Sequence, residues 1–398
     1  MKIIHITTAY PRYKGDVISP WLVRMLAGLR NRGHDVSVFT SSYKGLGFQV
    51  QDGIKVYRFR YAPAKYETLT HDMAVPERLK QGLIYKLLVF PYMKSGSLHA
   101  HFFPYKQDVI HVHWPIPHVL FGLQMKYRWK IPMLLYIHGG ELRFLSRLPS
   151  ALKKFFVYLL NKADYITVNS TYTRGLVESY GLKPPVEVIP FGNPFSEKMY
   201  PYREKGRKII LFVGRLIEVK GIDTLLRAFK IVKDSIPDAT LRIVGDGPLA
   251  SELRKLSDEL GLNVVFTGYK TGKELESEYL GASCFVLPSK PDRIGQVETL
   301  GVVAIEALSY GLPVIASNLG GIPDIVKNGE TGLLFEPGNY TELAARIIEI
   351  LKNPELAESL VRKGQEHVKT TFSWNAIIEK LERLYSRLIS VRDRPSKL

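Results

Sequence analysis

The order of short apolar segments constrains the fold of this chain more than any other feature of its sequence. In the first half, apolar runs of four to six residues alternate with helical patterns and with loops rich in glycine and proline. Such continuous runs are typical of parallel strands that are buried on both faces. The expected strands lie at 3–7, 35–40, 109–113, 133–138 and 165–169, and a helix is expected at 21–30.

The same alternation starts again after a short strand at 186–190 and a polar, proline-rich segment at 193–207. Two successive series predict an α/β protein with two doubly wound, Rossmann-like domains facing across a cleft, where ligands of such sheets bind. The second series has expected strands at 209–213, 240–245, 264–267, 284–288, 313–316 and 333–335, and helices at 224–234 and 304–309.

Domain boundaries follow from this pattern. We place the first domain at 1–192 and the second at 193–372, and we expect a C-terminal helix within 373–398. Residues 375–390 are amphipathic, with one apolar face. That helix either packs on the second domain or crosses back to the first.

Composition narrows the class of protein. The 398 residues are 45% hydrophobic and 23% charged, as in a globular chain of more than one domain. A single cysteine, Cys284, excludes intrachain disulfides and cysteine-based zinc sites, and fits a reducing cytosol. The first residues indicate a strand, not a signal peptide, and the longest apolar stretches are shorter than the roughly 20 residues of a membrane span. We therefore expect a cytoplasmic protein.

Charge is distributed unevenly along the chain. Residues 1–195 contain 26 Lys and Arg against 11 Asp and Glu, a net of +15, whereas residues 196–398 contain 29 against 27, a net of +2. Such asymmetry favours contact of the first half with an anionic surface: a membrane, a lipid phosphate or a nucleic acid. The alternative is that the excess of cations serves solubility and heat resistance.

The segment 213–221 carries the first sign of chemistry. It follows a strand, precedes a helix, and contains Gly214, Arg215, Lys220 and Gly221. The glycines permit close approach of the backbone to a ligand, and the two cations suit a pyrophosphate whose charge must be neutralised as it departs. Each cation alone is equally compatible with an ordinary surface position.

The segment 297–308 carries a more specific sign. Glu298 and Glu306 stand eight residues apart, and Gly301 lies at the expected start of an apolar helix. The N-terminus of a helix favours phosphate, and eight helical residues span about 12 Å, the scale of a nucleotide sugar. A buried glutamate on an apolar helix needs a polar partner, which ribose hydroxyls would supply. The alternative is a surface glutamate beside a structural glycine.

These two segments, together with 244–249 (Val-Gly-Asp-Gly-Pro-Leu) and 320–326 (Gly-Gly-Ile-Pro-Asp-Ile-Val), resemble the retaining glycosyltransferase family 4. The four motifs occur in order over most of residues 209–350. That family has the GT-B fold, and its glutamate pair is called the EX7E motif.

The resemblance implies roles for the donor side. Arg215 and Lys220 would bind the donor diphosphate, Glu298 the hexose hydroxyls and Glu306 the ribose. Backbone amides from Leu300 to Val303 would contact sugar and phosphate; these residues are Leu300, Gly301, Val302 and Val303, and Gly214 would flank them. Gly268-Tyr269-Lys270 would border the base, which makes Lys270 a candidate ligand. The segment 290–297 is longer than the usual loop of the family and is expected to affect selectivity.

The loop after the first strand, residues 10–16, resembles the family's N-terminal glycine-rich loop. Gly15 would bring backbone amides to the diphosphate. The family often has a second glycine where this chain has Asp16.

His138-Gly139-Gly140-Glu141 ends a strand that should point into the cleft. The resemblance implies that His138 lies beside the reacting sugar and supports the transition state; a structural histidine is the alternative. His111, His113 and His118 suggest a metal by spacing, but no carboxylate supports them, and no Asp-x-Asp pair occurs in the chain. We therefore expect no metal and no cofactor beyond the nucleotide-sugar donor.

Two basic, amphipathic stretches, 78–94 and 143–162, interleave apolar and cationic residues. Such helices can lie on anionic lipid at the inner face of a membrane, or their apolar faces can complete the domain core.

The sequence therefore predicts a retaining hexosyltransferase that uses a UDP- or GDP-linked sugar and a glycan, lipid or small-molecule acceptor, which is lipid-linked or otherwise anionic. One alternative is a nucleotide-sugar epimerase of the same fold. Others are a basic membrane- or nucleic-acid-binding protein, which lacks a recognised reader motif, and an NAD-dependent dehydrogenase, which lacks Gly-x-Gly-x-x-Gly after the first strand. We expect no nucleic-acid partner.

Overall fold

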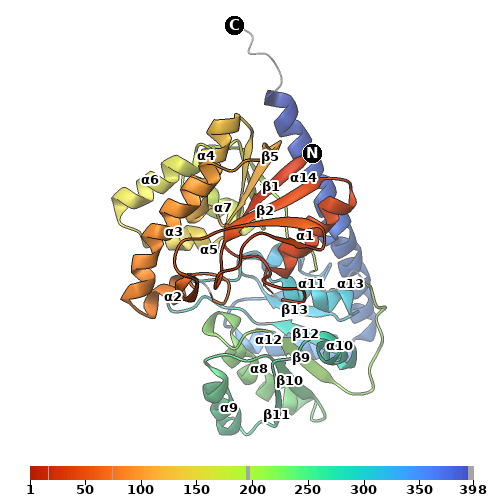
Figure 1. The fold of residues 1–398 in the computed structure, drawn as a ribbon. Coiled ribbons are helices and arrows are strands. Elements are labelled where there is room, and N and C mark those ends of the chain that lie inside the picture. Colours follow the sequence, from red (N-terminus) through yellow and green to blue (C-terminus); the bar gives the residue numbers. More distant parts are fainter. Residues whose placement is uncertain (17, 74, 194–197, 393–398) are drawn as a thin grey trace. The chain divides into compact units, whose positions relative to one another are not determined.

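The fold was analysed in a computed structural model that describes residues 1–16, 18–73, 75–193 and 198–392 (Figure 1). The chain forms two compact units. The first comprises Met1–Ile189 together with the chain from Ile377 onward, and the second comprises Pro190–Ala376. Part of the segment expected as a linker, 194–197, and the last residues of the expected C-terminal region, 393–398, lie outside the described residues.

The first unit is built on an eight-stranded sheet whose order is β3-β4-β2-β1-β5-β6-β7-β8. All neighbouring pairs are parallel except the antiparallel pair of β3 and β4. The chain order reverses between β1 and β5, which makes that pair the switch point of the sheet. The strands are β1 (Lys2–Ile6), β2 (Asp35–Ser41), β3 (Gln49–Gln51), β4 (Ile54–Phe59), β5 (Val109–His113), β6 (Met133–Ile137), β7 (Tyr165–Val168) and β8 (Val186–Val188).

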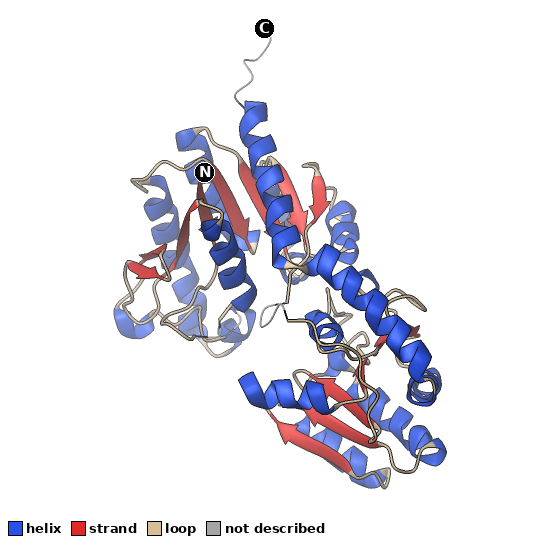
Figure 2. Cartoon of the chain, turned by 90° about the vertical axis from the view of Figure 1, so that its right-hand side faces the viewer, coloured by secondary structure: helices blue, strands red, loops and turns tan. Residues whose placement is uncertain are grey.

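Helices cover both faces of this sheet (Figure 2). They are α1 (Pro20–Asn31), α2 (Val75–Lys80), α3 (Leu83–His101), α4 (Pro115–Trp129), α5 (Gly140–Ser146), α6 (Ser150–Leu160) and α7 (Thr171–Ser179). The central strands are buried throughout, with β5 and β6 inaccessible at every residue. Continuous apolar sequence is therefore needed on both sides of the sheet, as the pattern predicted.

The second unit has a six-stranded parallel sheet in the order β11-β10-β9-β12-β13-β14. Numbered within the unit this is 3-2-1-4-5-6, the order of a Rossmann sheet, and its switch point lies between β9 and β12. The strands are β9 (Ile209–Val213), β10 (Thr240–Val244), β11 (Val264–Gly268), β12 (Cys284–Leu287), β13 (Val314–Ser317) and β14 (Leu333–Phe335).

Helices also flank the second sheet (Figure 2). They are the short η2 (Glu218–Lys220), α8 (Ile222–Ser235), α9 (Ala250–Glu259), α10 (Gly272–Gly281), α11 (Val302–Ser309), η3 (Ile322–Asp324), α12 (Tyr340–Lys352), α13 (Pro354–His367) and η4 (Val368–Phe372). The cysteine predicted to be unpaired, Cys284, is buried on β12, where burial raises the pKa of its thiol to about 12.

The last helix, α14 (Trp374–Arg392), belongs to the first unit from Ile377 onward. Its apolar face is buried there: Ile378 packs where any side chain at Gly28 of α1 would clash, and the Tyr385 hydroxyl meets His111 at 2.7 Å. At its rim, Glu382 accepts hydrogen bonds from Arg32 and His34. The amphipathic pattern at 375–390 thus serves core packing.

The predicted α/β class with two doubly wound domains is confirmed, and the predicted strands fall within two residues of the observed ones. The hairpin of β3 and β4 was not predicted. None of the described helices combines the length and apolar character that a membrane crossing requires.

Candidate active site

Two of the predicted donor-binding residues lie in the loop that leaves β9. Lys220 ends η2, and its ammonium forms an ion pair with the carboxylate of Glu298. Both side chains are about five-sixths buried, with 16% and 17% of their surface exposed. Arg215, two residues after β9, is exposed, and its guanidinium has neither an ion pair nor a hydrogen bond with any described residue. The loop therefore presents one free cation and one cation held by a carboxylate.

Glu298 approaches Lys220 from the loop that leaves β12, the strand beside β9. Gly301 then caps α11 with a φ of 87°, a conformation that side chains disfavour. A Cβ at Gly301 would also come within 3.0 Å of Leu287 and 3.7 Å of the Glu298 Cγ. Val302 and Val303 supply the first amides of α11, which have no partner inside a helix. Leu300 is buried at 2% exposure and fixes the turn.

Gly320 explains why the fourth motif begins with glycine. Its φ is 59°, and a Cβ there would lie 1.9 Å from the carbonyl oxygen of Glu298. The amide of Gly321 donates to the same carbonyl oxygen at 3.1 Å. The Gly-Gly pair thus packs against the backbone of Glu298 and positions that glutamate.

Glu306 lies on the buried face of α11, as predicted for an apolar helix. The Tyr279 hydroxyl on α10 donates to its carboxylate at 2.8 Å. Burial raises the pKa of Glu306 to about 7, while the hydrogen bond from Tyr279 and the charge of Lys220 act in the opposite direction. Lys220 thus acts on both glutamates of the motif, by contact with Glu298 and by its field at Glu306.

Lys270 is already paired with a carboxylate of the second unit. It forms an ion pair with Glu278, which also accepts hydrogen bonds from Arg242 at 2.6 and 2.8 Å. The pKa of Glu278 is lowered by these two cations. Tyr269, the residue before Lys270, is 72% exposed. The predicted contact of this segment with a base stays a prediction.

The long segment 290–297 folds on itself. The Asp292 carboxylate accepts from the amides of Ile294 and Gln296, at 3.0 and 2.7 Å. Lys290 anchors its start by an ion pair of 2.6 Å with Asp223 on α8. Its effect on selectivity stays a prediction.

In the first unit, His138 directly follows β6 and is 6% exposed. Its ring lies among aromatic rings, with centroids 4.9 Å from Trp21, 4.7 Å from Tyr136 and 5.5 Å from Trp114. Burial lowers the pKa of His138 to about 3, so the imidazole is neutral at physiological pH. It can therefore act through hydrogen bonding, without a charge of its own.

Glu141 lies three residues further on, in the first turn of α5, and is 2% exposed. Its Oε1 accepts from the backbone amide of His138 at 2.7 Å, whereas no described residue hydrogen-bonds its Oε2. Burial raises the pKa of this carboxyl to about 7. The sequence drew attention to Glu141 only as part of the motif around His138.

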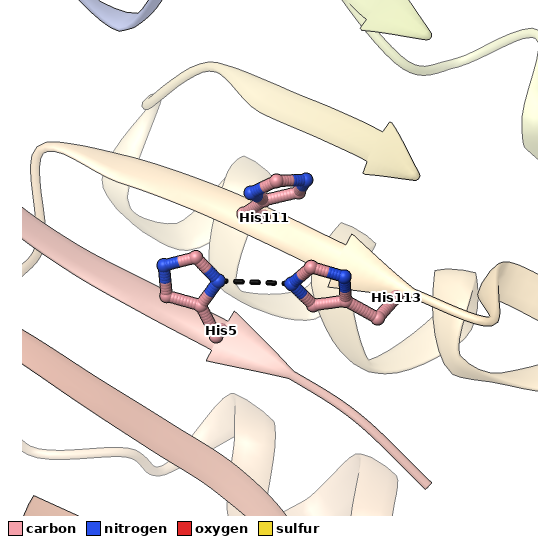
Figure 3. Close-up of side chains that lie close together, drawn as sticks. All are labelled: His5, His111 and His113. Atoms are coloured by element: carbon pink, nitrogen blue, oxygen red, sulfur yellow. Dashed lines mark hydrogen bonds between the residues drawn. The ribbon is translucent and has the colours of Figure 1, made fainter. Parts of the chain in front are cut away.

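His111 and His113 lie on one face of β5, as predicted, but His118 does not join them. Its ring bonds to the Tyr92 hydroxyl and the Trp114 carbonyl, at 2.9 and 2.8 Å. The third member of the cluster is His5 on β1, the register partner of His111 (Figure 3).

The nitrogens of this cluster lie within 4.8 Å of one another, and all three side chains are fully buried. His5 Nδ1 and His113 Nε2 share a hydrogen bond of 2.9 Å, and the rings of that pair stack at 5.2 Å (Figure 3). Burial lowers the pKa of each ring, to about 3 for His5, and neutral imidazole is the form that binds zinc and other transition ions. Metal independence stays a prediction, and a metal ion bound by this cluster would contradict it.

The glycine-rich loop of the first unit is closed by Asp16. The carboxylate accepts from the Arg12 guanidinium at 2.7 Å and from the Arg12 amide at 2.9 Å. Gly15 is exposed with a φ of 90°. Its predicted contact with a diphosphate stays a prediction.

Two family models together match most of the chain. Residues 20–193 match the family described as Glycosyltransferase Family 4, and residues 196–367 match Glycosyl transferases group 1. The chain is 32% identical over 263 residues to a mannosyltransferase of Mycobacterium tuberculosis, which covers 63% of this chain and 68% of that protein. The chain belongs to glycosyltransferase family 4.

Solved structures agree with the GT-B fold of a family 4 glycosyltransferase. Sucrose-phosphate synthase from Thermosynechococcus elongatus superposes with a TM-score of 0.74 at 24% identity, over 98% of this chain and 99% of that one. Anabaena HepE in complex with UDP-glucose superposes with a TM-score of 0.67 at 19% identity, over 97% and 100% of the chains. At these identities the similarity establishes the fold.

Of the predicted donor-side residues, the structure brings together Lys220, Glu298 and Gly301; their binding of a donor stays a prediction. Two residues, Tyr279 and His5, were missed, and so was the buried, half-paired carboxyl of Glu141. Tyr279 stands 27 residues before Glu306 and carries no local signal for its hydroxyl contact. His5 could have been found by noting that a first strand at a switch point pairs with the strand of His111 and His113.

Proposed function

We propose that this glycosyltransferase transfers a hexose from a UDP- or GDP-linked donor to a lipid-linked or otherwise anionic acceptor, with retention of configuration and without a metal. The observation that carries the proposal is the ion pair of Lys220 and Glu298 beside the N-terminus of α11. Within this unit, Lys220 and the first amides of α11 suit the phosphates, Glu298 suits the hexose, and Glu306 suits the ribose.

The departing diphosphate is the first requirement of the reaction. Lys220 and the free Arg215 supply two positive charges, and the first amides of α11, from Val302 and Val303, supply hydrogen-bond donors at the positive end of a helix. Groups fixed in advance where negative charge develops stabilise the transition state without reorganisation. No acid is then required to protonate the leaving group.

The two glutamates recognise the sugars. Glu298 is paired with Lys220 in the donor-free chain, so a donor exchanges this contact for one between Lys220 and phosphate and one between Glu298 and hexose hydroxyls. Glu306 accepts from Tyr279 and retains a second oxygen for a ribose hydroxyl. Both carboxylates act by accepting hydrogen bonds.

His138 is assigned to the acceptor. Its neutral ring, at the carboxyl end of β6, orients the attacking hydroxyl. In the step that forms product, the acceptor oxygen bonds to the anomeric carbon on the face from which the phosphate oxygen leaves. The acceptor proton passes to that departing phosphate. Configuration is thereby retained.

The named relatives support the substrate classes. The mycobacterial relative is a GDP-mannose-dependent phosphatidylinositol monomannoside mannosyltransferase, and HepE was solved with UDP-glucose. Both use or hold a nucleotide sugar, and the first acts on a glycolipid. These names favour a transferase over the epimerase and nucleic-acid alternatives.

A membrane surface is the proposed setting for an anionic lipid acceptor. On α3, Leu87 and Phe90 are 65% and 74% exposed, and on α6 Phe155 and Tyr158 are 46% and 58% exposed. The helices predicted as lipid-binding thus bury part of their apolar residues and expose the rest. Sedimentation with phosphatidylglycerol vesicles checks this: the Leu87→Glu, Phe90→Glu variant should remain in solution while the native chain sediments.

A donor screen tests the proposed reaction. UDP-, GDP- and ADP-sugars are measured for thermal stabilisation, and the stabilising donor is then used to assay transfer and the anomeric configuration of the product by NMR. Glu306→Ala and Lys220→Ala should each abolish transfer while preserving cooperative melting. Turnover retained in both variants would overturn the site, and an inverted product would overturn retention.

A further inference from the structure

A cavity of about 580 Å³ opens within the first unit, and none of the residues predicted as ligands belongs to its lining. Its floor is formed where β1 and β5 end, at Thr7 and Trp114, and by the start of α5. These are the carboxyl ends at the switch point of the sheet, where ligands of doubly wound sheets bind. The volume is that of a small-molecule site.

The walls of the cavity are mostly apolar. Helices α2, α3, α4, α5 and α6 each contribute residues to its lining. Their contributions include Leu79, Val89, Met93, Phe144 and Phe156. At the rim, Leu152 is 47% exposed and Met73 is 37% exposed. An apolar space that opens to solvent through apolar residues favours a hydrocarbon ligand.

Two carboxyl groups line this space, Asp72 and Glu141; Asp72 forms an ion pair with Arg78, whereas Glu141 lies at the floor. Glu141 lines the cavity, is 2% exposed, and leaves its Oε2 without a hydrogen bond from any described residue. A buried carboxylate oxygen needs a donor. The other oxygen of Glu141 holds the backbone of His138, so a hydroxyl bound by Oε2 lies next to the residue assigned to the acceptor.

The outer surface beside the rim is suited to an anionic lipid layer. Exposed cations with no ion pair to a described residue accompany the exposed apolar residues of α3 and α6: Lys86, Lys94, Arg147 and Lys154. The same helices therefore carry the cavity wall on one side and a basic, apolar face on the other. A ligand that enters past Leu152 comes from this face.

We propose that the cavity binds the hydrocarbon chain of a membrane amphiphile that serves as acceptor, and that Glu141 accepts a hydrogen bond from a hydroxyl of its head group. That the amphiphile is the acceptor rests on the proposed function, whereas the binding of an amphiphile rests on the cavity alone. The head group lies at the carboxyl ends of β1 and β5, and the chain extends between α2, α3 and α6.

A larger hollow of about 900 Å³ in the same unit does not fit this role. It is lined by Lys126, Lys130 and Asp164 together with Arg387 of α14, and it lies where β6 and β7 begin. The amino ends of parallel strands lack the switch-point geometry, and Lys126 is already paired with Asp164 at 2.7 Å.

The test measures binding of n-octyl β-D-glucoside below its micelle concentration, with methyl β-D-glucoside and octanesulfonate as comparisons. The native chain should bind octyl glucoside at least tenfold more tightly than methyl glucoside. Val89→Trp fills the cavity and should weaken both octyl ligands tenfold or more. Leu98→Trp, at a 48% exposed position of the same helix, should leave both unchanged. If Val89→Trp does not fold, Leu152→Trp at the rim is read in its place.

Glu141→Gln separates the head group from the chain. Glutamine keeps an oxygen for the His138 amide but replaces the free oxygen with a donor, so octyl glucoside affinity should fall about tenfold while octanesulfonate affinity stays unchanged. A purely structural Glu141 would change both affinities together, and that result would overturn the assignment.

Two further readouts keep this inference distinct from the proposed function. Donor binding should be unchanged in Val89→Trp, and the Leu87→Glu, Phe90→Glu variant should lose vesicle binding but keep its affinity for octyl glucoside. Equal affinity for octyl and methyl glucoside in the native chain would overturn the cavity proposal even if transfer is demonstrated. Octyl glucoside binding in a chain that binds no nucleotide sugar would overturn the proposed function alone.

Discussion

The two units of this molecule share a sheet architecture but differ in what they place at its switch point. Between β9 and β12 of the second unit, the loops bring together a lysine, two glutamates and the start of a helix. At β1 and β5 of the first unit, the strands themselves carry neutral imidazoles, and a buried carboxyl and a mostly apolar cavity lie at the carboxyl end of the sheet. The two switch points therefore differ in chemistry: the second unit presents charged groups, and the first presents neutral rings beside a mostly apolar cavity.

The difference shows how parallel sheets separate stability from chemistry. In both units the central strands are largely buried, and they set where the loops emerge. Lys220, Glu298 and Glu141 lie in loops or in the first turn of a helix, whereas the imidazoles of the first unit lie on β1 and β5. The substitutions below test whether charge governs one site and neutral burial the other.

Lys220→Ala is expected to have the largest effect. Removing a group that stabilises developing charge costs about 10²–10³-fold in turnover, and Lys220 also holds Glu298. Steady-state transfer assays measure the loss. Lys255→Ala on α9, whose lysine is 79% exposed, is the control and should remain within twofold of the native chain. A loss below tenfold for Lys220→Ala would show that charge does not govern the second site.

Glu306→Gln should alter the pH dependence of stability. The native carboxyl has its pKa raised from 4.5 to about 7 by burial, so the folded state holds a proton between these values that the unfolded state releases. Native stability therefore falls as pH rises from 4.5 to 7, whereas glutamine does not titrate. The variant should gain on the order of 2 kcal/mol relative to the native chain between pH 5 and pH 8. Denaturant titrations at the two pH values measure this, and a constant difference would contradict the assigned burial.

Tyr385→Phe probes the neutral layer of the first unit. It removes the hydroxyl that bonds to His111 at 2.7 Å in a fully buried position, which should cost about 1–2 kcal/mol of stability. Thermal unfolding measures the change. Arg383→Ala on the same helix breaks an exposed pair with Glu379 and should cost less than about 0.5 kcal/mol. Equal losses of stability in the two variants would contradict a buried hydrogen bond between Tyr385 and His111.

Removal of metal should have the smallest effect. Dialysis against EDTA is expected to leave the transfer rate within twofold, because the donor site holds its charge with Lys220 and Arg215. Metal content by mass spectrometry accompanies the assay. Activity that is lost on dialysis, restored by Zn²⁺ and absent in a His5→Gln variant would instead assign a metal to the cluster of His5, His111 and His113.

Much of the fold could be predicted because burial on both faces leaves a direct trace in sequence. The strands at 109–113 and 209–213 coincide with the observed β5 and β9. The hairpin of β3 and β4 was missed, although Asp52-Gly53 links the two strands, both with positive φ, and β4 alternates polar and apolar residues. An Asp-Gly turn is a known hairpin signal. These short strands were missed because they lack the continuous apolar runs on which the strand prediction rested.

The candidate donor-side residues could be picked out from the sequence because they lie in short motifs, each within one loop and helix. The other site was harder to find, because its parts come from distant segments. His5 meets His111 only through the pairing of β1 with β5, and the cavity is lined by residues from five helices, α2 to α6. Tyr279 likewise reaches Glu306 from another helix. No local pattern encodes such contacts.

The central claim is that the second unit binds a nucleoside diphosphate sugar through Lys220 and the start of α11. Calorimetric titration of UDP and GDP into the native chain and into Lys220→Ala tests it most directly. We predict saturable binding of one nucleotide to the native chain and at least a tenfold weaker affinity in the variant. Equal affinity in both proteins, or no binding of either nucleotide to the native chain, would contradict the account.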